Sequence, residues 1–487
     1  MKKQVISMIT ACLLSAAAMV PSFAEDGSAA SAKAGGATDV LGSLYTHISE
    51  NVKAEAPSLK ARPVPLTPEQ GKELLSAMAE KAVKEHPDRF EAYVFRGSMY
   101  YMKGEKEKCF ADLDHAVSLA PENPLSYGSR AEIYALDKQE APALRDWDKA
   151  LSLNPNDKIK DEIYSQRGFF LMARGHYKEA ISDFQNDLKY IHPKLRFVLY
   201  TAMGESYAML GNNEEAEKSY RASVKESPKN PLSWEMAAHF YSERMKKYDK
   251  AKEYYDKAIA LSPGTERLYR SAGLNALDAD HSEEAAAYFT KAIQVKPSSH
   301  IDYFLRGSAY AKMGNYKTAV DDLTKAMELE KEPDGLSYAL RGICYQELGL
   351  YDKALSDYHA ASALKPTDAG TWESMGYIYS LRGEHDKAIP CYEKAIALRP
   401  GYGEAYNNLG YTWFQKGNKD KALDYLNKAI EVNPKYAESY RSRAEVYESM
   451  GEYDKALADM DRFTALSPKD ARGREFRDRL EKKSKGS

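Results

Sequence analysis

The stretch that decides the fold is residues 403–434, with the sequence GEAYNNLGYTWFQKGNKDKALDYLNKAIEVNP. Its apolar residues recur every three or four positions in two helix-length runs, which a Lys-Gly-Asn turn separates. Gly410 lies in the first run and Ala422 in the second, and the stretch closes at Pro434, which cannot continue a helix. These features predict a hairpin of two antiparallel helices.

The same pattern recurs along most of the chain. Prolines that close a helix follow one another at intervals of 33 to 38 residues, most often 34, from Pro87 to Pro468. A hairpin of this size has more apolar surface than it can cover alone, so neighbouring hairpins must stack. Counting Gly403 as position 1, we find eleven full units over roughly residues 90–468. A lone helix is expected at 68–86, and a charged capping helix near 470–483.

Three positions of the unit have nearly fixed residue types. Position 8 is Gly in eight units and Ala in three, position 20 is Ala in ten units and Cys in one, and position 4 is always aromatic. Small residues let the two helices approach closely, while the aromatic rings fill the space around them. This pattern resembles the tetratricopeptide repeat family. The resemblance implies an all-α, right-handed superhelix (α-solenoid) of about eleven helical hairpins, whose first helices line a concave groove.

A second pattern is internal to this chain. Six units carry Arg at position 7, and the same six carry Asp at position 23, whereas the other five units have neither. The family's geometry places these positions on facing helices, so we predict an Arg–Asp ion pair within each hairpin. Six repetitions favour a structural role over a catalytic one. The pairs are Arg96 and Asp112, Arg130 and Asp146, Arg167 and Asp183, Arg306 and Asp322, Arg341 and Asp357, and Arg443 and Asp459.

Residues 1–24 have the features of a secretory signal peptide. Two lysines precede an apolar run from Val5 to Val20, and Ser22 and Ala24 then place small residues at the −3 and −1 positions of the cleavage site. We therefore expect cleavage after Ala24 and an exported protein, periplasmic or otherwise extracytoplasmic. Two alternatives stay open: the run remains as a membrane anchor, or Cys12 is lipidated as part of a lipobox. We expect no transmembrane segment in the mature chain, because no other apolar run is long enough.

Between the signal peptide and the repeats, residues 25–66 are predicted to form a flexible linker. It contains a short amphipathic segment at 39–55, which either docks on the repeats or binds a partner. Residues 67–487 are assigned to the repeat array with its extra first helix and its cap. The cysteines that remain after cleavage fall inside repeat helices at spacings that fit no zinc site, so we expect buried thiols without a disulfide framework. They are Cys109, Cys344 and Cys391.

Charge and motifs argue against several classes of function. The chain has 69 Lys and Arg against 72 Asp and Glu, a net charge of −3, which does not favour broad binding to nucleic acid. It contains no phosphate-binding loop, metalloprotease motif or nucleophile elbow, and its ten histidines are scattered. The sequence therefore predicts no enzyme activity, no catalytic residues, no cofactor and no metal.

The remaining candidate is a groove that binds a protein or peptide. The family resemblance places positions 2, 5, 9 and 12 of each unit in the groove, and several of these are large and apolar here. The candidate groove residues are Tyr101, Phe169, Met172, Phe304, Ile343, Tyr377, Tyr411 and Phe414. The alternative is that these side chains pack against the neighbouring unit. The chain lacks the Lys- and Asn-rich set with which some family members bind peptide C-termini.

These observations indicate a non-catalytic scaffold that binds a protein or peptide in a bacterial cell envelope; homo-oligomer formation stays open. One alternative is an assembly factor or co-chaperone for envelope export machinery, of polysaccharide or outer-membrane protein. An alternative from another class is a carbohydrate-binding or hydrolytic envelope protein. A continuous apolar groove would favour a peptide ligand, and a closed pocket with convergent carboxylates would favour chemistry. The third unit departs from the pattern, with Asp187 at position 27 and longer loops, which suggests a bend there.

Overall fold

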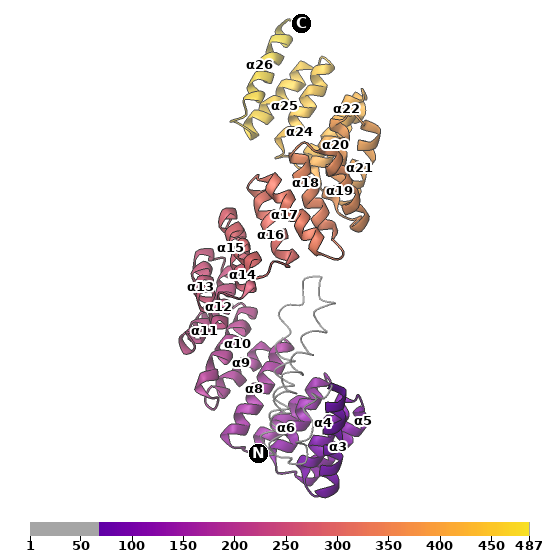
Figure 1. Cartoon of the computed structure of the whole chain (residues 1–487). Coiled ribbons are helices and arrows are strands. Elements are labelled where there is room, and N and C mark those ends of the chain that lie inside the picture. The colour runs from indigo at the N-terminus through magenta and orange to yellow at the C-terminus, as the bar shows by residue number, and fades with distance from the viewer. Residues whose placement is uncertain (1–67, 487) are drawn as a thin grey trace. The chain divides into compact units, whose positions relative to one another are not determined.

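The computed structural model describes residues 68–486, so the predicted signal peptide, linker and amphipathic segment lie outside the described residues. All regular elements in this part of the chain are helices (Figure 1). The chain divides into two compact units, the first ending at Leu261 and the second beginning at Ser262.

The first unit consists of a single helix followed by five helical hairpins, with one short 3-10 turn between α9 and α10. Its elements are α3 (Pro68–Glu85), α4 (Phe90–Met102), α5 (Lys106–Leu119), α6 (Pro124–Leu136), α7 (Glu140–Ser152), α8 (Asp157–Ala173), α9 (Tyr177–Asp187), η2 (Pro193–Leu195), α10 (Arg196–Met209), α11 (Asn213–Glu226), α12 (Pro231–Glu243) and α13 (Tyr248–Leu261).

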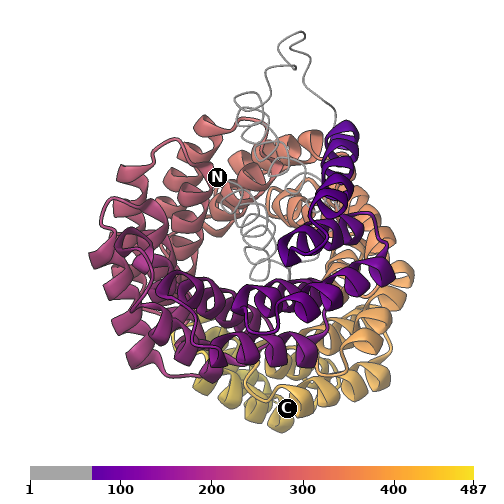
Figure 2. The same cartoon turned by 90° about the horizontal axis from the view of Figure 1, so that it is seen from below.

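The second unit consists of six hairpins and a terminal helix. Its elements are α14 (Glu266–Asp278), α15 (Ser282–Val295), α16 (His300–Lys312), α17 (Tyr316–Leu329), α18 (Gly335–Glu347), α19 (Tyr351–Leu364), α20 (Ala369–Leu381), α21 (His385–Leu398), α22 (Gly403–Gln415), α23 (Lys419–Val432), α24 (Ala437–Ser449), α25 (Tyr453–Leu466) and α26 (Ala471–Gly486). Within each unit, successive hairpins follow one another in chain order along a curved path (Figure 2).

The eleven predicted hairpins are thus confirmed. The boundary between the two units follows the fifth hairpin. The bend that the sequence suggested at the third hairpin stays a prediction. The third hairpin still differs from the others, because α9 ends early at Asp187 and η2 leads into the next hairpin.

Each hairpin turns at one residue with a left-handed backbone. In eight hairpins this residue is glycine, such as Gly417 with φ of 86°. Its N–H donates to the carbonyl oxygen of Phe414 at 2.8 Å, and the next N–H donates to Trp413 at 2.9 Å, which closes the end of the first helix. In the other three hairpins, Lys138, Lys246 and Asp280 adopt the same conformation, with φ between 51° and 65°.

The small residue at position 8 is required where the two helices of a hairpin cross. A Cβ atom on Gly376 would lie 2.8 Å from the ring of Tyr392, and one on Gly410 would lie 2.8 Å from Leu426. The core also continues from hairpin to hairpin, since residues of α19, α20 and α21 form one buried cluster that includes Tyr358. A hairpin therefore buries its apolar residues both internally and against its neighbour.

All six predicted Arg–Asp pairs are present, each with two parallel hydrogen bonds from one guanidinium to one carboxylate. The donor–acceptor distances in the six pairs range from 2.6 to 2.9 Å. All six Asp residues are buried. This fork geometry is the strongest form of a charged hydrogen bond, and it fixes the crossing of the two helices.

Each of these arginines also contacts the element that precedes its hairpin. The Nη1 atom of Arg341 donates to Thr324 Oγ1 of the preceding hairpin at 3.1 Å, and Arg443 donates in the same way to Asn427 at 2.7 Å. The Arg341 guanidinium also lies 5.7 to 5.9 Å from the ring centroids of Tyr338 and Tyr345. One arginine therefore links two consecutive hairpins.

The described residues contain three cysteines, and the same residues can be searched for membrane-spanning helices and metal sites. Cys109, Cys344 and Cys391 are free and buried there, and burial raises the pKa of each thiol. Within residues 68–486, no helix combines the length and the apolar character that a bilayer span requires. The same residues contain no cluster of three or more His, Cys, Asp or Glu suited to a metal ion.

Candidate partner-binding groove

In the first unit, the three predicted groove residues lie at the edges of packed cores. Tyr101 packs against the cluster around Leu113, and burial is the main reason that its pKa is raised. Phe169 and Met172 pack against another cluster, with the Phe169 ring centroid 4.9 Å from that of Phe184. These side chains are half-buried, as the packing alternative expects.

In the second unit, the five remaining residues differ in exposure. Phe304 and Phe414 pack at the edges of apolar clusters. Tyr411 is half-buried, and its ring centroid lies 6.0 Å from that of Phe414. Ile343 and Tyr377 remain 42% and 40% exposed. Of the eight candidates, these last two offer the most side-chain surface to a partner.

Tyr377 belongs to a surface hollow of about 530 Å³, which we call the acidic hollow. It is formed by α18, α20 and α22, together with the first residue of α19 and the residue before α24. The lining consists of three carboxylates, four phenol rings and two amides: Glu347, Glu373, Glu404, Tyr351, Tyr377, Tyr402, Tyr436, Gln346 and Asn408. No basic side chain of the described residues lines it.

Hydrogen bonds from α22 fix the central carboxylate of the hollow. Asn408 Nδ2 donates to Glu373 Oε1 at 2.7 Å, and the buried Asn407 donates in turn to Asn408 Oδ1 at 3.0 Å. Among the residues that the structure describes, none of Glu347, Glu373 and Glu404 forms an ion pair. Glu373 is therefore held in place by a hydrogen bond, and no ion pair with a described residue neutralises the three carboxylates.

Burial and neighbouring carboxylates raise the pKa of three groups in the lining. Burial raises the pKa of Glu373, and the charge of Glu404 raises it further, while the Asn408 hydrogen bond opposes the shift. Burial, followed by nearby carboxylates, raises the pKa of Tyr402 and of Tyr436 to about 12 in each case. Both kinds of shift show that further negative charge is unfavourable here.

Two arginines lie near the hollow but already have partners. The Arg399 guanidinium stacks 4.5 Å from the centroid of the Tyr402 ring. Arg441 donates to Glu438 at 2.6 Å and also to Glu445. Neither guanidinium lines the hollow.

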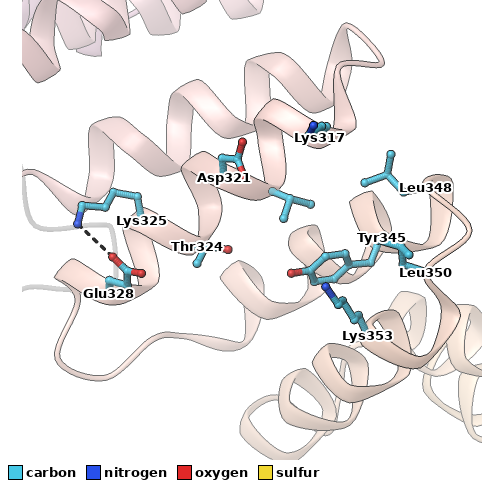
Figure 3. Close-up of a pocket in the computed structure, with 10 residues that line it drawn as sticks. Lys317, Asp321, Thr324, Lys325, Glu328, Tyr345, Leu348, Leu350 and Lys353 are labelled. Carbon is cyan, nitrogen blue, oxygen red and sulfur yellow. Dashed lines mark hydrogen bonds and ion pairs between the residues drawn. The ribbon is translucent and has the colours of Figure 1, made fainter.

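A second hollow, of about 410 Å³, lies between α17, α18 and α19 and differs in chemistry (Figure 3). Lys325 pairs with Glu328 at 3.0 Å across one side, as the dashed line in Figure 3 shows. On the other side, Lys353 Nζ lies 5.4 Å from the Tyr345 ring centroid. Its lining carries charges of both signs: Lys317, Lys325 and Lys353 beside Asp321 and Glu328. It is therefore less one-sided in charge than the acidic hollow.

The first unit also holds isolated buried carboxyl groups. Glu132 is 4% exposed, and burial raises its pKa well above the usual value, while Gln166 donates to one of its oxygens. Asp187 is fully buried, and burial together with the neighbouring Asp161 raises its pKa to about 8. Both side chains are buried among packed helices, so we assign them to the core.

Sequence reasoning found Tyr377 but missed the carboxylates around it. Glu373 and Glu404 occupy positions 5 and 2 of their units, which the family resemblance places in the groove, so a search for acidic groove positions would have found them. Tyr402 and Tyr436 stand just before position 1 of their units, outside the repeat pattern. Their contribution depends on how consecutive hairpins stack.

Comparison with known families identifies the repeats. Models described as "Tetratricopeptide repeat" match residues 90–123, 198–230, 232–265, 303–333, 403–436 and 425–458, and one described as "TPR repeat" matches 376–417. The chain belongs to the tetratricopeptide repeat family.

Individual relatives share part of the array. The "Mitochondrial import receptor subunit TOM70" of Rattus norvegicus is 25% identical over 187 residues, 36% of this chain and 30% of that protein. The chain thus matches less than a third of the length of that relative. The "Photosystem I assembly protein Ycf3" of Rippkaea orientalis is 31% identical over 123 residues, 22% of this chain and 71% of that protein.

Solved structures with the same kind of repeat are similar to this chain. The yeast Tom70 structure is 17% identical, with a TM-score of 0.38, and the match covers 86% of this chain and 97% of that one. The structure described as "YrrB: a TPR protein with an unusual peptide-binding site" is 26% identical with a TM-score of 0.34, covering 39% and 96%.

Proposed function

We propose that this protein is a non-catalytic scaffold that binds a protein or peptide partner along the first helices of its repeats. The observation that carries this proposal is the acidic hollow, where residues of three consecutive first helices face one space of about 530 Å³. Surfaces shared by stacked hairpins are the usual binding sites of repeat proteins. The exposed Tyr377 ring supplies the type of side chain that anchors protein interfaces.

We further propose that the scaffold works in a bacterial cell envelope after export. The support is the amino-terminal sequence, with its two lysines, the apolar run from Val5 to Val20 and the small residues Ser22 and Ala24 at the cleavage site. These residues lie outside the described part of the chain.

A more specific version is an assembly factor or co-chaperone for envelope export machinery. The relative named as a photosystem I assembly protein supports an assembly role, because this chain covers 71% of its length at 31% identity. Both versions use the same groove, and the identity of the partner decides between them.

The alternative of a carbohydrate-binding or hydrolytic protein draws on the same hollow. Glu373, whose pKa is raised, and the nearby Glu404 are the residue types that such chemistry uses. The hollow is open rather than closed, and its carboxylates line a surface shared by stacked repeats, which favours binding. It also differs from the continuous apolar groove that would most simply indicate a peptide.

Photo-crosslinking in the native host tests the scaffold proposal. Probes at Tyr377 and Tyr411 lie on first helices, and a probe at the exposed Lys394 of α21 serves as the control. We expect a distinct protein adduct from the two first-helix probes and none from Lys394. Adducts only within the chain itself would contradict the proposal and indicate self-association.

A further inference from the structure

We propose that the acidic hollow binds a basic side chain, lysine or arginine, from a segment of the partner protein. This inference rests on the scaffold function and specifies the chemistry of the ligand. The hollow presents three carboxylates, and no basic side chain of the described residues lines it. A cation is the group that such a surface lacks.

The geometry of the lining supports a cationic ligand in two independent ways. Glu373 is held by Asn408 at 2.7 Å, so one carboxylate is oriented before any ligand arrives. The phenol rings of Tyr351 and Tyr377 also line the hollow and can contact an ammonium or guanidinium group. Carboxylates and aromatic faces together select cations over other polar ligands.

The chain already uses this chemistry within its own fold. The guanidinium of Arg341 is held by the Asp357 carboxylate and lies 5.7 to 5.9 Å from the centroids of two tyrosine rings. The Arg399 guanidinium likewise lies 4.5 Å from the centroid of the Tyr402 ring. The hollow provides the carboxylates and the rings, but none of the described residues that line it provides the cation.

The size of the hollow fits a peptide rather than a small ion. About 530 Å³ lies within the range of roughly 300–1,000 Å³ that organic ligands occupy. A long basic side chain can bury its methylene groups against tyrosine rings while its charged end meets the carboxylates. The amides of Gln346 and Asn408 line the same space and can pair with a peptide backbone.

The test measures binding of labelled peptides to the full chain by fluorescence polarisation. The peptides share one Gly-Ser frame and carry lysine, Nε-acetyllysine or glutamate at the same places. We expect the lysine peptide to bind most tightly and to weaken as salt is raised, because the contact is between charges. Acetylation removes the charge and keeps the length of the side chain, so the acetylated peptide should bind at least about tenfold more weakly.

The variant Glu373→Gln with Glu404→Gln removes two charges and keeps the Asn408 hydrogen bond, because a glutamine oxygen also accepts. The matched control, Glu393→Gln with Asp424→Asn, makes the same change of charge at exposed positions on the second helices α21 and α23. We expect the first variant to weaken binding of the lysine peptide by about tenfold or more, and the control to leave it unchanged.

Three results would overturn the inference: equal affinity for the lysine and acetyllysine peptides, no loss in the Glu373 and Glu404 variant, or no binding of the lysine peptide at millimolar concentration. If a partner is still crosslinked through Tyr377 by a segment without basic residues, the scaffold function stands and the cationic specificity fails. If neither the crosslink nor peptide binding is seen, both fail.

Discussion

The replacement Arg341→Met should destabilise the second unit strongly, because it leaves a buried carboxylate alone. Arg341 donates to both oxygens of Asp357 at 2.8 and 2.9 Å, and Asp357 is only 5% exposed. Breaking one side of a buried pair costs about 3–5 kcal/mol, since the remaining charge loses its partner. The hydrogen bond to Thr324, at 3.1 Å, is lost as well and adds about 1 kcal/mol.

The double replacement Arg341→Met with Asp357→Cys should cost much less. It copies the next hairpin of the same unit, where Met375 and Cys391 occupy positions 7 and 23 and are both buried. A well-packed apolar pair is often as stable as a buried ion pair, so the remaining loss is the Thr324 contact, about 1 kcal/mol. For a unit of this size, 1 kcal/mol corresponds to about 2–4 °C in melting temperature.

Thermal unfolding followed by circular dichroism measures the comparison. We expect Arg341→Met to lower the melting temperature by about 8–24 °C and the double variant by about 2–4 °C. The exposed pair Arg382 and Asp352, at 2.7 Å, provides the control, and Arg382→Met there should change little. The gap between single and double variants should also narrow at acidic pH, where the lone carboxylate becomes neutral. Equal losses in the two variants at neutral pH would refute the reasoning.

Two further predictions concern one buried acid and one helix crossing. Burial and Asp161 raise the pKa of Asp187 to about 8. The Asp187 carboxyl therefore binds its proton more tightly in the folded chain than in the unfolded chain. Because of this difference, the stability of the fold should fall as the pH rises from about 4 to about 8. Asp187→Asn, which stays neutral, should therefore melt above the wild type by a wider margin at pH 8 than at pH 5, and equal margins would contradict this. Gly376→Ala should destabilise by about 1–3 kcal/mol in urea unfolding, because its Cβ would lie 2.8 Å from Tyr392. Gly370→Ala in the same helix, where the nearest atom is 3.8 Å away, should be neutral or stabilising, and an equal loss at both glycines would refute the packing argument.

The fold could be predicted from the sequence because every hairpin has the same pattern of residue types at the same spacing. The positions of Gly410 and Ala422 follow from the helix crossing, and the Arg–Asp pairs recur at a fixed spacing of 16 residues. Pairing within a hairpin is local, so sequence spacing determines it. The turn at Lys246 shows the limit, since a lysine takes a left-handed conformation that glycine occupies in most hairpins.

Only part of the acidic hollow could be predicted from the sequence, because the hollow depends on contacts between hairpins. Its carboxylates Glu373 and Glu404 come from different hairpins and lie about 30 residues apart in sequence, and their shared space is set by stacking. The search for apolar groove residues found Tyr377 at the hollow, but it also selected Phe169, whose ring packs against Phe184. A large apolar residue at a groove position is consistent with either role, and only its exposure distinguishes them.

The near-neutral charge of the chain conceals this local imbalance. Six arginines are matched by six aspartates inside the hairpins, and these pairs contribute nothing to the net charge of −3. In the two hairpins that supply Glu373 and Glu404, position 7 is instead Met375 and Leu409, both buried in apolar clusters. In these two hairpins, apolar packing instead of an Arg–Asp pair stabilises the crossing of the helices. The net charge of the whole chain therefore says little about the charge of the hollow, because composition averaged over 487 residues does not show where the acidic residues lie.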